Sequence, residues 1–241
     1  LPQPWNFIAI PLLMALELAV PAWAERGCKD GTPWHAHHIA ERYGLMTIIV
    51  LGECVLGTAN DVASVYQAIG WSWQLGLVGL GGLGLVLCLW WIYFLLPSGE
   101  ALHNHRERAW GWGYAHFFLF GSIAAMGSGL QVVADVLKHA HPDLTGVHAV
   151  TPLYAILSVA LPQLVFMAVV WFLWTYASQA KAARRYHLAP LVLACLAAVV
   201  LGVAQGLPLA WALPLLCLAP ILTITYHSCG QQHRGGDYQV Q

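Results

Sequence analysis

The sequence predicts an all-helical protein whose helices cross a lipid bilayer several times as a bundle. Hydrophobic residues make up 59% of the 241 residues and charged residues only 9%, whereas soluble domains carry about 25% charged residues. The mean hydropathy is +0.64, and apolar runs of membrane-spanning length recur along the chain. The composition therefore predicts the lipid bilayer as a partner. No basic run indicates a nucleic acid.

A transmembrane helix needs about 17 to 25 mostly apolar residues, and seven segments of the chain meet this requirement. We place them at residues 5–24, 38–66, 71–96, 110–137, 150–178, 188–206 and 208–227. They form one transmembrane domain over residues 1–227. Residues 228–241 have no apolar periodicity, so we expect a disordered tail there.

Small residues and prolines indicate how some of these segments pack. Segment 71–96 contains five glycines within nine residues, and Gly121, Ala125 and Gly129 recur at four-residue intervals in the next segment. Such small-residue faces let two helices approach closely. Prolines within the fifth and seventh segments predict kinks.

The basic residues predict how the chain is oriented in the membrane. If the seven segments alternate in direction, Lys138 lies on one side, Arg42 lies within a segment, and the other eight share the opposite side. Cytoplasmic loops are enriched in Lys and Arg, so residue 1 of this chain should lie outside and the tail in the cytoplasm. The eight residues are Arg26, Lys29, Arg106, Arg108, Lys181, Arg184, Arg185 and Arg234.

Ionisable residues are concentrated in the second segment, which carries Glu41, Arg42, Glu53 and Asp61. At 3.6 residues per turn, Arg42, Glu53 and Asn60 fall nearly on one line, and Arg42 lies about 16 Å from Glu53 along the helix. A charge at the bilayer centre costs roughly 2.5 to 3.5 kcal/mol. We therefore expect this line to face the interior of the bundle or a water-filled cavity.

Glu53 is expected near mid-membrane, where a carboxyl group could bind and release protons or attract a cation. A protonated Glu53 that only donates a hydrogen bond is the alternative. Arg42 and Glu41 could form a gate on the cytoplasmic side, or could act as clamps that hold helices in register. Their candidate partners on other helices are Glu17, His116 and Gln163.

Two further acidic residues are secondary candidates for an intramembrane site. Asp61 continues the charged segment, and Asp135 follows Gln131 by one helical turn near the outer end of segment 110–137. A solvated helix end is the simpler interpretation of Asp135, because a carboxylate near the interface needs no buried partner.

Histidines raise the alternative of a metal site on the cytoplasmic side. His35, His37 and His38 precede Glu41, while His103 and His105 fall in the next cytoplasmic loop. Zinc or copper could be held by three imidazoles with Glu41, although the spacing matches no standard site. A weaker set on the outer side consists of His139, His141 and His148. No particular cofactor is indicated, and ordinary interfacial histidines are the competing interpretation.

Several enzyme classes are excluded by missing motifs. The sequence has no phosphate-binding Gly-Lys-Ser pattern and no Gly-x-Ser-x-Gly elbow. The seventh segment contains no Lys that could form a Schiff base with retinal. An enzyme is therefore less expected than a transport or structural protein.

Two stretches resemble the bacterial low-temperature-requirement A family. His38, Glu41-Arg42, Gly44-Leu45 and Leu51-Gly52-Glu53 form one, and His116 lies in the other, Tyr114 to Gly127. The resemblance implies a bacterial cytoplasmic membrane protein and directs attention to His38, Glu41, Arg42, Glu53 and His116. It also implies that the family's N-terminal portion, with its Glu-Leu-Phe-Phe-Asp type motif, is not represented in residues 1–33. It supplies no biochemical activity.

Three functions remain open. The leading hypothesis is a transporter or channel-like protein for a small solute or ion, with Glu53 as the titrating or cation-attracting group. The second is an accessory subunit that packs against a larger membrane complex. The third is a membrane enzyme with a metal held by His35, His38, Glu41 and His105.

Overall fold

The computed structural model describes residues 3–26, 33–139, 150–178 and 188–235, and this part of the chain is helical, without strands. Within these ranges, six helical segments are long and apolar enough to cross a membrane, and a shorter apolar helix accompanies them. The predicted class, a polytopic helical bundle, is confirmed. In chain order the elements are α1 (Gln3–Arg26), α2 (Ala36–Ile69), α3 (Trp73–Phe94), α4 (Ser98–Asn104), η1 (Arg106–Arg108), α5 (Ala109–His139), α6 (Pro152–Ser178), α8 (Ala189–Ala204), α9 (Leu209–Leu216) and α10 (Leu218–Gly235).

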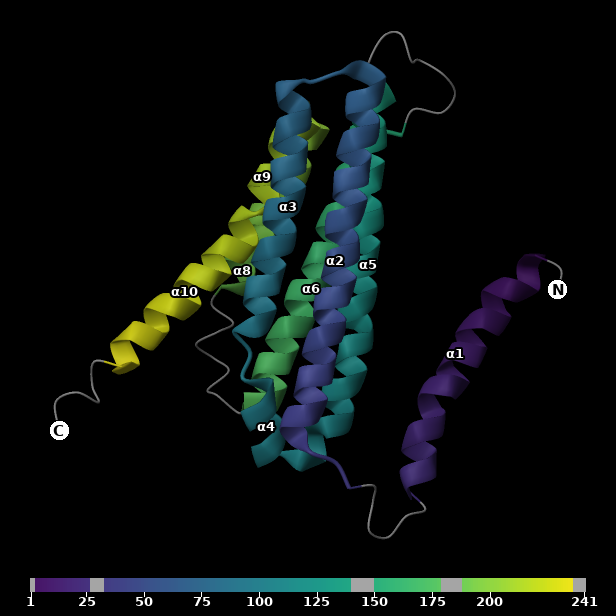
Figure 1. The fold of residues 1–241 in the computed structure, drawn as a ribbon, viewed down its shortest axis with the longest axis vertical. Helices are drawn as coiled ribbons and strands as arrows, with labels where there is room; N and C mark the ends of the chain where they lie inside the picture. Colours follow the sequence, from purple (N-terminus) through teal and green to yellow (C-terminus); the bar gives the residue numbers. More distant parts are fainter. Residues whose placement is uncertain (1–2, 27–32, 140–149, 179–187, 236–241) are drawn as a thin grey trace.

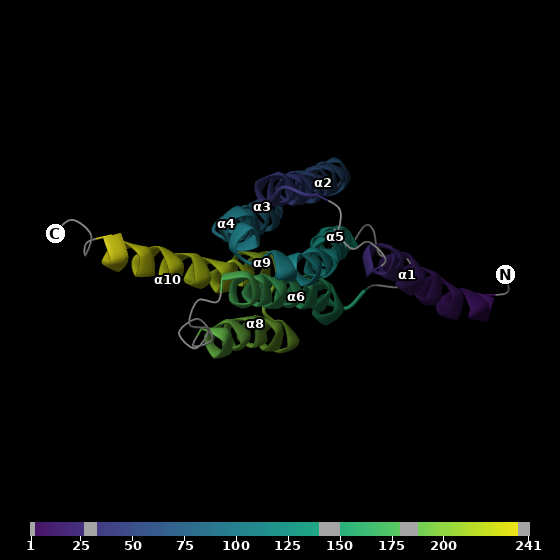
Figure 2. The same ribbon diagram turned by 90° about the horizontal axis from the view of Figure 1, so that it is seen from below.

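The long helices α2, α3, α5 and α6 run side by side and form the body of the molecule (Figure 1). The pairs α5–α6 and α2–α5 pack most extensively, and α3 packs along α9. Seen from below, α8 covers the side of α6 that faces away from α2 and α3 (Figure 2). Helix α1 extends along the outside of the bundle (Figure 1), with none of its apolar window Phe7–Ala24 buried, and it contacts α5 where the Tyr114 hydroxyl donates to the Leu18 carbonyl.

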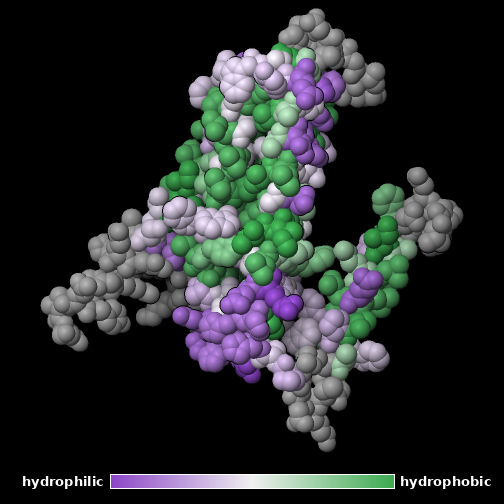
Figure 3. Space-filling model, viewed as in Figure 1, coloured by the Kyte–Doolittle hydropathy of each residue, from purple (hydrophilic) through white to green (hydrophobic). Residues whose placement is uncertain are grey.

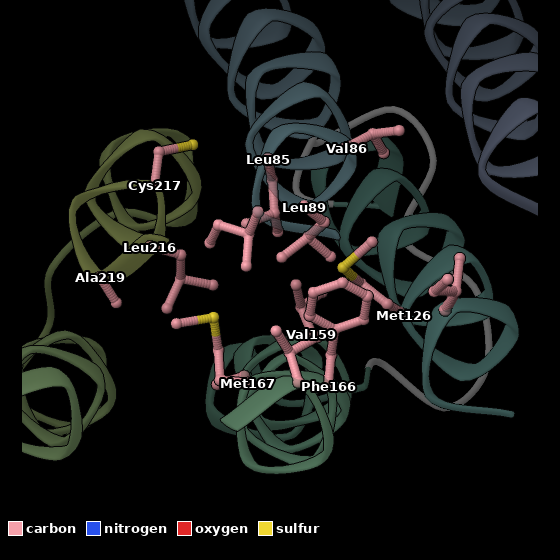
Figure 4. Packing of buried hydrophobic residues seen from close by; sticks show 14 of the residues in the cluster. Leu85, Val86, Leu89, Met126, Val159, Phe166, Met167, Leu216, Cys217 and Ala219 are labelled. Atoms are coloured by element: carbon pink, nitrogen blue, oxygen red, sulfur yellow. The ribbon is translucent and has the colours of Figure 1, made fainter. Parts of the chain in front are cut away.

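The core fills the space between α3, α5, α6 and α9 (Figure 4). Leu85 and Leu89 of α3 meet Met126 of α5, with Phe166 of α6 on the far side, and all four are essentially inaccessible. Lipid is as apolar as these side chains, so close van der Waals packing rather than escape from water holds such helices together. Packing geometry therefore decides which helix faces meet.

Glycine permits the closest helix contacts. A Cβ at Gly129 of α5 would lie 2.6 Å from the carbonyl carbon of Ser158 in α6, and one at Gly81 of α3 would lie 2.8 Å from the nitrogen of Pro214 in α9. At Gly121 a Cβ would meet nothing within 4 Å. The four-residue pattern in α5 therefore contributes one close contact within this chain, at Gly129.

The segment predicted as one span over 208–227 is divided into α9 and α10 at Cys217. Pro220 has no N–H, so the carbonyl of Leu216 loses its usual helical donor four residues later. The buried Gln163 of α6 replaces it, because its Nε2 donates to the Leu216 carbonyl at 2.9 Å. Helix α10 then continues to Gly235, into the part of the chain for which we expected a disordered tail; residues 236–241 lie outside the described residues.

Polar residues gather at the end of the bundle where α2 begins and α4 lies, below an apolar middle (Figure 3). The two chain segments there are joined by Arg106 of η1, whose Nη2 donates to the Trp34 carbonyl at 2.8 Å. Its guanidinium carbon also lies 4.7 Å from the centre of the Trp34 ring. Arg108 donates to the carbonyl of Tyr176 at the end of α6. These contacts bring η1, the start of α2 and the end of α6 together.

Candidate functional site

The charged line of α2 lies on the outside of this chain. Gly44, Thr47 and Cys54 are buried against the rest of the bundle, whereas Arg42, Glu53 and Asn60 are exposed on the other side of the helix. We call these three residues the α2 polar line. We expected the line to face the bundle interior or a water-filled cavity. It does not face the interior of this chain, because the small residues of α2 allow the closer approach and so form the packed face.

Glu53 occupies the middle of this exposed line, 17 residues from the start of a 34-residue helix. At 1.5 Å per residue it lies about 25 Å from either end of α2. Among the described residues its carboxylate has no hydrogen bond or ion pair. Only 17% of the most apolar window of α2 is buried, compared with 44% in the segment that contains α5. Glu53 is therefore an ionisable group in the middle of a membrane-length helix, without a hydrogen-bonding or ionic partner among the described residues.

The three expected partners of the charged line lie elsewhere. Glu17 is exposed on α1, and His116 is buried in the bundle. Gln163 donates a hydrogen bond to the Leu216 carbonyl at the α9–α10 break. None of them forms an ion pair or hydrogen bond with Arg42 or Glu41 in the described part of the chain. Among the described residues, these three candidate partners therefore do not pair with the charged residues of α2.

His116 is the centre of a buried aromatic cluster. Its Nδ1 lies 2.8 Å from the Trp112 carbonyl and its Nε2 lies 3.1 Å from the Tyr93 hydroxyl. A carbonyl can only accept, so Nδ1 carries the proton and Nε2 accepts from Tyr93. Tyr43 of α2 packs edge-on against His116, with ring centres 4.8 Å apart. The neutral imidazole thus has both nitrogens satisfied and joins α5 to α3.

A groove of about 670 Å³ opens beside this cluster, between the first half of α2 and the α3–α4 connection. His37 and Glu41 line it from α2, and Glu100 lines it from α4. Tyr93, which is 4% exposed, and Phe94 of α3 also belong to its lining. The groove therefore has both ionisable and aromatic side chains in its lining.

Several of the histidines considered as metal ligands lie close together where α2 begins and beside α4. The ring centres of His35 and His37 lie 5.9 Å apart, and those of His37 and His103 lie 6.1 Å apart. His38 Nδ1 lies 3.5 Å from a Glu41 oxygen, and His105 Nδ1 lies 3.4 Å from Glu107. Within the described ranges, no group of three or more His, Cys, Asp or Glu residues is positioned to hold a metal ion. His141 and His148 lie outside those ranges.

Asp61 and Asp135 lie on adjacent faces of α2 and α5. One Asp61 oxygen is inaccessible and has no hydrogen-bond partner, whereas Asp135 is exposed, as the helix-end interpretation predicts. Lys138 reaches Ser64 at 3.4 Å rather than either carboxylate. This pair is separate from the groove and from the α2 polar line.

Sequence reasoning did not single out Tyr93, Phe94 or Glu100. Tyr93 and Phe94 lie in an aromatic run that is typical of a membrane interface, so nothing in the pattern distinguishes them. The available signal was Pro97, which ends the α3 region and lets α4 turn Glu100 towards α2. The pairing of these residues with Glu41 depends on helix packing.

The comparison with protein families found a match over most of the chain. A family model described as bacterial low temperature requirement A protein (LtrA) matches residues 1–222. The chain belongs to this family. No curated protein and no solved structure showed a significant match. LtrA membership together with the membrane-length helices shows an integral membrane protein that resides in a lipid bilayer.

Proposed function

We propose that this LtrA protein is a transport or channel-like protein for a small cation, and that its path runs along the α2 polar line. The observation that carries the proposal is Glu53, an exposed carboxyl in the middle of a membrane-length helix. Intramembrane carboxyls commonly mark ion pathways, and acidic side chains around a pore favour cations. Asn60 and Arg42 extend the polar character of the same face towards both ends.

The path requires a further protein surface opposite α2. Ile49 and Leu56 are also exposed on this side of the helix, so the face is an apolar surface crossed by a polar line. Lipid can cover the apolar side chains but solvates Glu53 poorly, at a cost of roughly 2.5 to 3.5 kcal/mol on insertion scales. A second membrane protein surface, with water between it and Glu53, removes most of that cost.

A second candidate is an accessory subunit of a larger membrane complex. It is favoured by α1, whose apolar window has no buried residue, and by the sparse burial of α2. In this case Glu53 would be paired in a dry interface rather than hydrated. The two candidates differ in whether Glu53 affects ion flux or only assembly.

We further propose that the protein resides in the bacterial cytoplasmic membrane with its basic loops in the cytoplasm. The asymmetry of Lys and Arg supports this orientation. Arg106 and Arg108 lie at the end of the bundle where α2 begins and α6 ends. The groove then opens towards the cytoplasmic side, and the chain forms one transmembrane domain.

The test is cation flux in liposomes that contain the protein as isolated from its native membrane. A pH-sensitive dye reports proton flux, and a potassium-sensitive dye reports flux of a larger cation. We expect Glu53→Gln to lower the flux about tenfold or more, because it removes the charge while keeping the size. The matched control is Glu107→Gln, which neutralises a carboxylate in η1, outside the polar line.

Two results would contradict transport through this face. One is wild-type protein that carries neither cation, and the other is equal flux in wild type and Glu53→Gln. If Glu53→Gln instead releases a co-purifying protein while Glu107→Gln retains it, the accessory-subunit function is supported.

A further inference from the structure

The groove between α2 and the α3–α4 connection has two acidic walls. Glu41 projects from α2 and Glu100 from α4, so the carboxylates come from two elements that approach each other only in the folded chain. Glu41 interacts with His38 at 3.5 Å, while Glu100 has no hydrogen bond or ion pair among the described residues. None of the residues that line the groove is Lys or Arg. Its electrostatic potential therefore favours a cation.

The rest of the lining is apolar and aromatic. Leu45 and Ile48 of α2 face Phe94 and Leu96 across the groove. Helix α2 lies close to Phe94 of α3 here, because a Cβ at Gly44 would be in ordinary van der Waals contact with the Phe94 ring, at 3.4 Å. A bare metal ion would gain nothing from these side chains, whereas the organic part of a larger cation would be desolvated against them. Aromatic faces also attract ammonium groups directly.

The backbone holds the polar rim in place. A Cβ at Gly99 would lie 2.5 Å from the Nδ1 atom of His37, so the imidazole rests directly against the start of α4. Tyr93, which also lines the groove, is fixed by the hydrogen bond between its hydroxyl and the fully buried His116. The groove is thus built on fixed elements, and its volume of about 670 Å³ falls within the range of small-molecule sites.

We propose that this groove binds a small organic cation, an ammonium group attached to an apolar body. The charged head lies between Glu41 and Glu100, and the apolar body lies against Phe94 and its neighbours. The groove and the α2 polar line are on different faces of α2, so this site is independent of the proposed path at Glu53. The ammonium group can belong to a free solute or to the headgroup of a lipid such as phosphatidylethanolamine.

Equilibrium dialysis of the purified protein against benzyltrimethylammonium tests the proposal. We expect Glu41→Gln and Glu100→Gln each to weaken binding about fivefold, and the double variant to weaken it further. Binding should also weaken as salt is raised, because both carboxylates are exposed. Benzenesulfonate, which has a similar ring but a negative charge, should not bind measurably.

The matched control is Glu107→Gln, an exposed carboxylate of η1 that does not line the groove. It should bind the probe as wild type does, and circular dichroism should show the same helix content in all variants. Nanodiscs with and without phosphatidylethanolamine separate the two sources, since a lipid headgroup in the groove would compete with the probe. Equal binding of benzenesulfonate, or unchanged affinity in the double variant, overturns the proposal.

Discussion

A single methyl group added to α5 should either destabilise or stabilise the protein, depending on which glycine receives it. At Gly129 the new Cβ would lie 2.6 Å from the Ser158 carbonyl carbon and 3.0 Å from the Val159 nitrogen. Both atoms belong to the backbone of α6, which cannot turn away as a side chain can. The two helices must separate along one of the most extensive contacts of the bundle.

The expected size follows from two opposing terms. Overpacking typically lowers the free energy of unfolding by about 1 to 3 kcal/mol. Because this clash involves backbone atoms, we expect a loss of about 3 kcal/mol. Replacing glycine by alanine inside a helix raises the free energy of unfolding by about 1 kcal/mol, because alanine has the higher helix propensity. Gly129→Ala should therefore lower the free energy of unfolding by about 2 kcal/mol. At about 2 to 4 °C per kcal/mol, Tm should fall by about 4 to 8 °C.

Gly121→Ala is the matched control, because it makes the same change eight residues earlier in the same helix. A Cβ there meets nothing within 4 Å, so the helix-propensity gain of up to about 1 kcal/mol remains. Thermal unfolding in detergent, followed by circular dichroism, compares the two. If Gly129→Ala is as stable as wild type, or if both variants shift Tm in the same direction, the close approach of α5 and α6 at Gly129 is contradicted.

The remaining predictions concern buried hydrogen bonds. Gln163→Leu should lower the free energy of unfolding by about 1 to 3 kcal/mol, because the Leu216 carbonyl would lose its donor at the α9–α10 break; chemical denaturation measures this, and an unchanged midpoint would contradict it. His116→Phe should cost about 1 to 3 kcal/mol because it leaves the Tyr93 hydroxyl without its partner. Adding Tyr93→Phe should recover part of that loss in a double-mutant cycle, and strict additivity of the two changes would show that the bond contributes nothing.

Much of the fold was predictable because its signals are local. A membrane-length apolar run needs no information from the rest of the chain, since every backbone polar group must be satisfied within its own helix in lipid. The helical segments around residues 38–66, 71–96, 110–137 and 150–178 follow from this alone. The division of the last span was not expected, although Pro214 and Pro220 were visible, because a proline can either bend a helix or end it.

The candidate site was predictable in part. The neighbourhood of His37 and His103 follows from topology, since both flank segment ends on the same side of the membrane. The direction of the α2 polar line does not follow, because periodicity identifies the residues that share a face but not what that face meets. The groove requires Glu41 and Glu100 to converge from separate elements.

The sequence by itself determined that this is a helical membrane protein of the LtrA family, with its ionisable groups concentrated in one span. Composition, the length of apolar runs and motif spacing are properties of contiguous residues, so they can be recognised from the sequence without a structure. Only the tertiary structure decided that α2 packs through Gly44, Thr47 and Cys54, and so leaves Glu53 on the outer face. That choice depends on how closely two helix backbones can approach, which is a property of helix pairs rather than of either sequence segment.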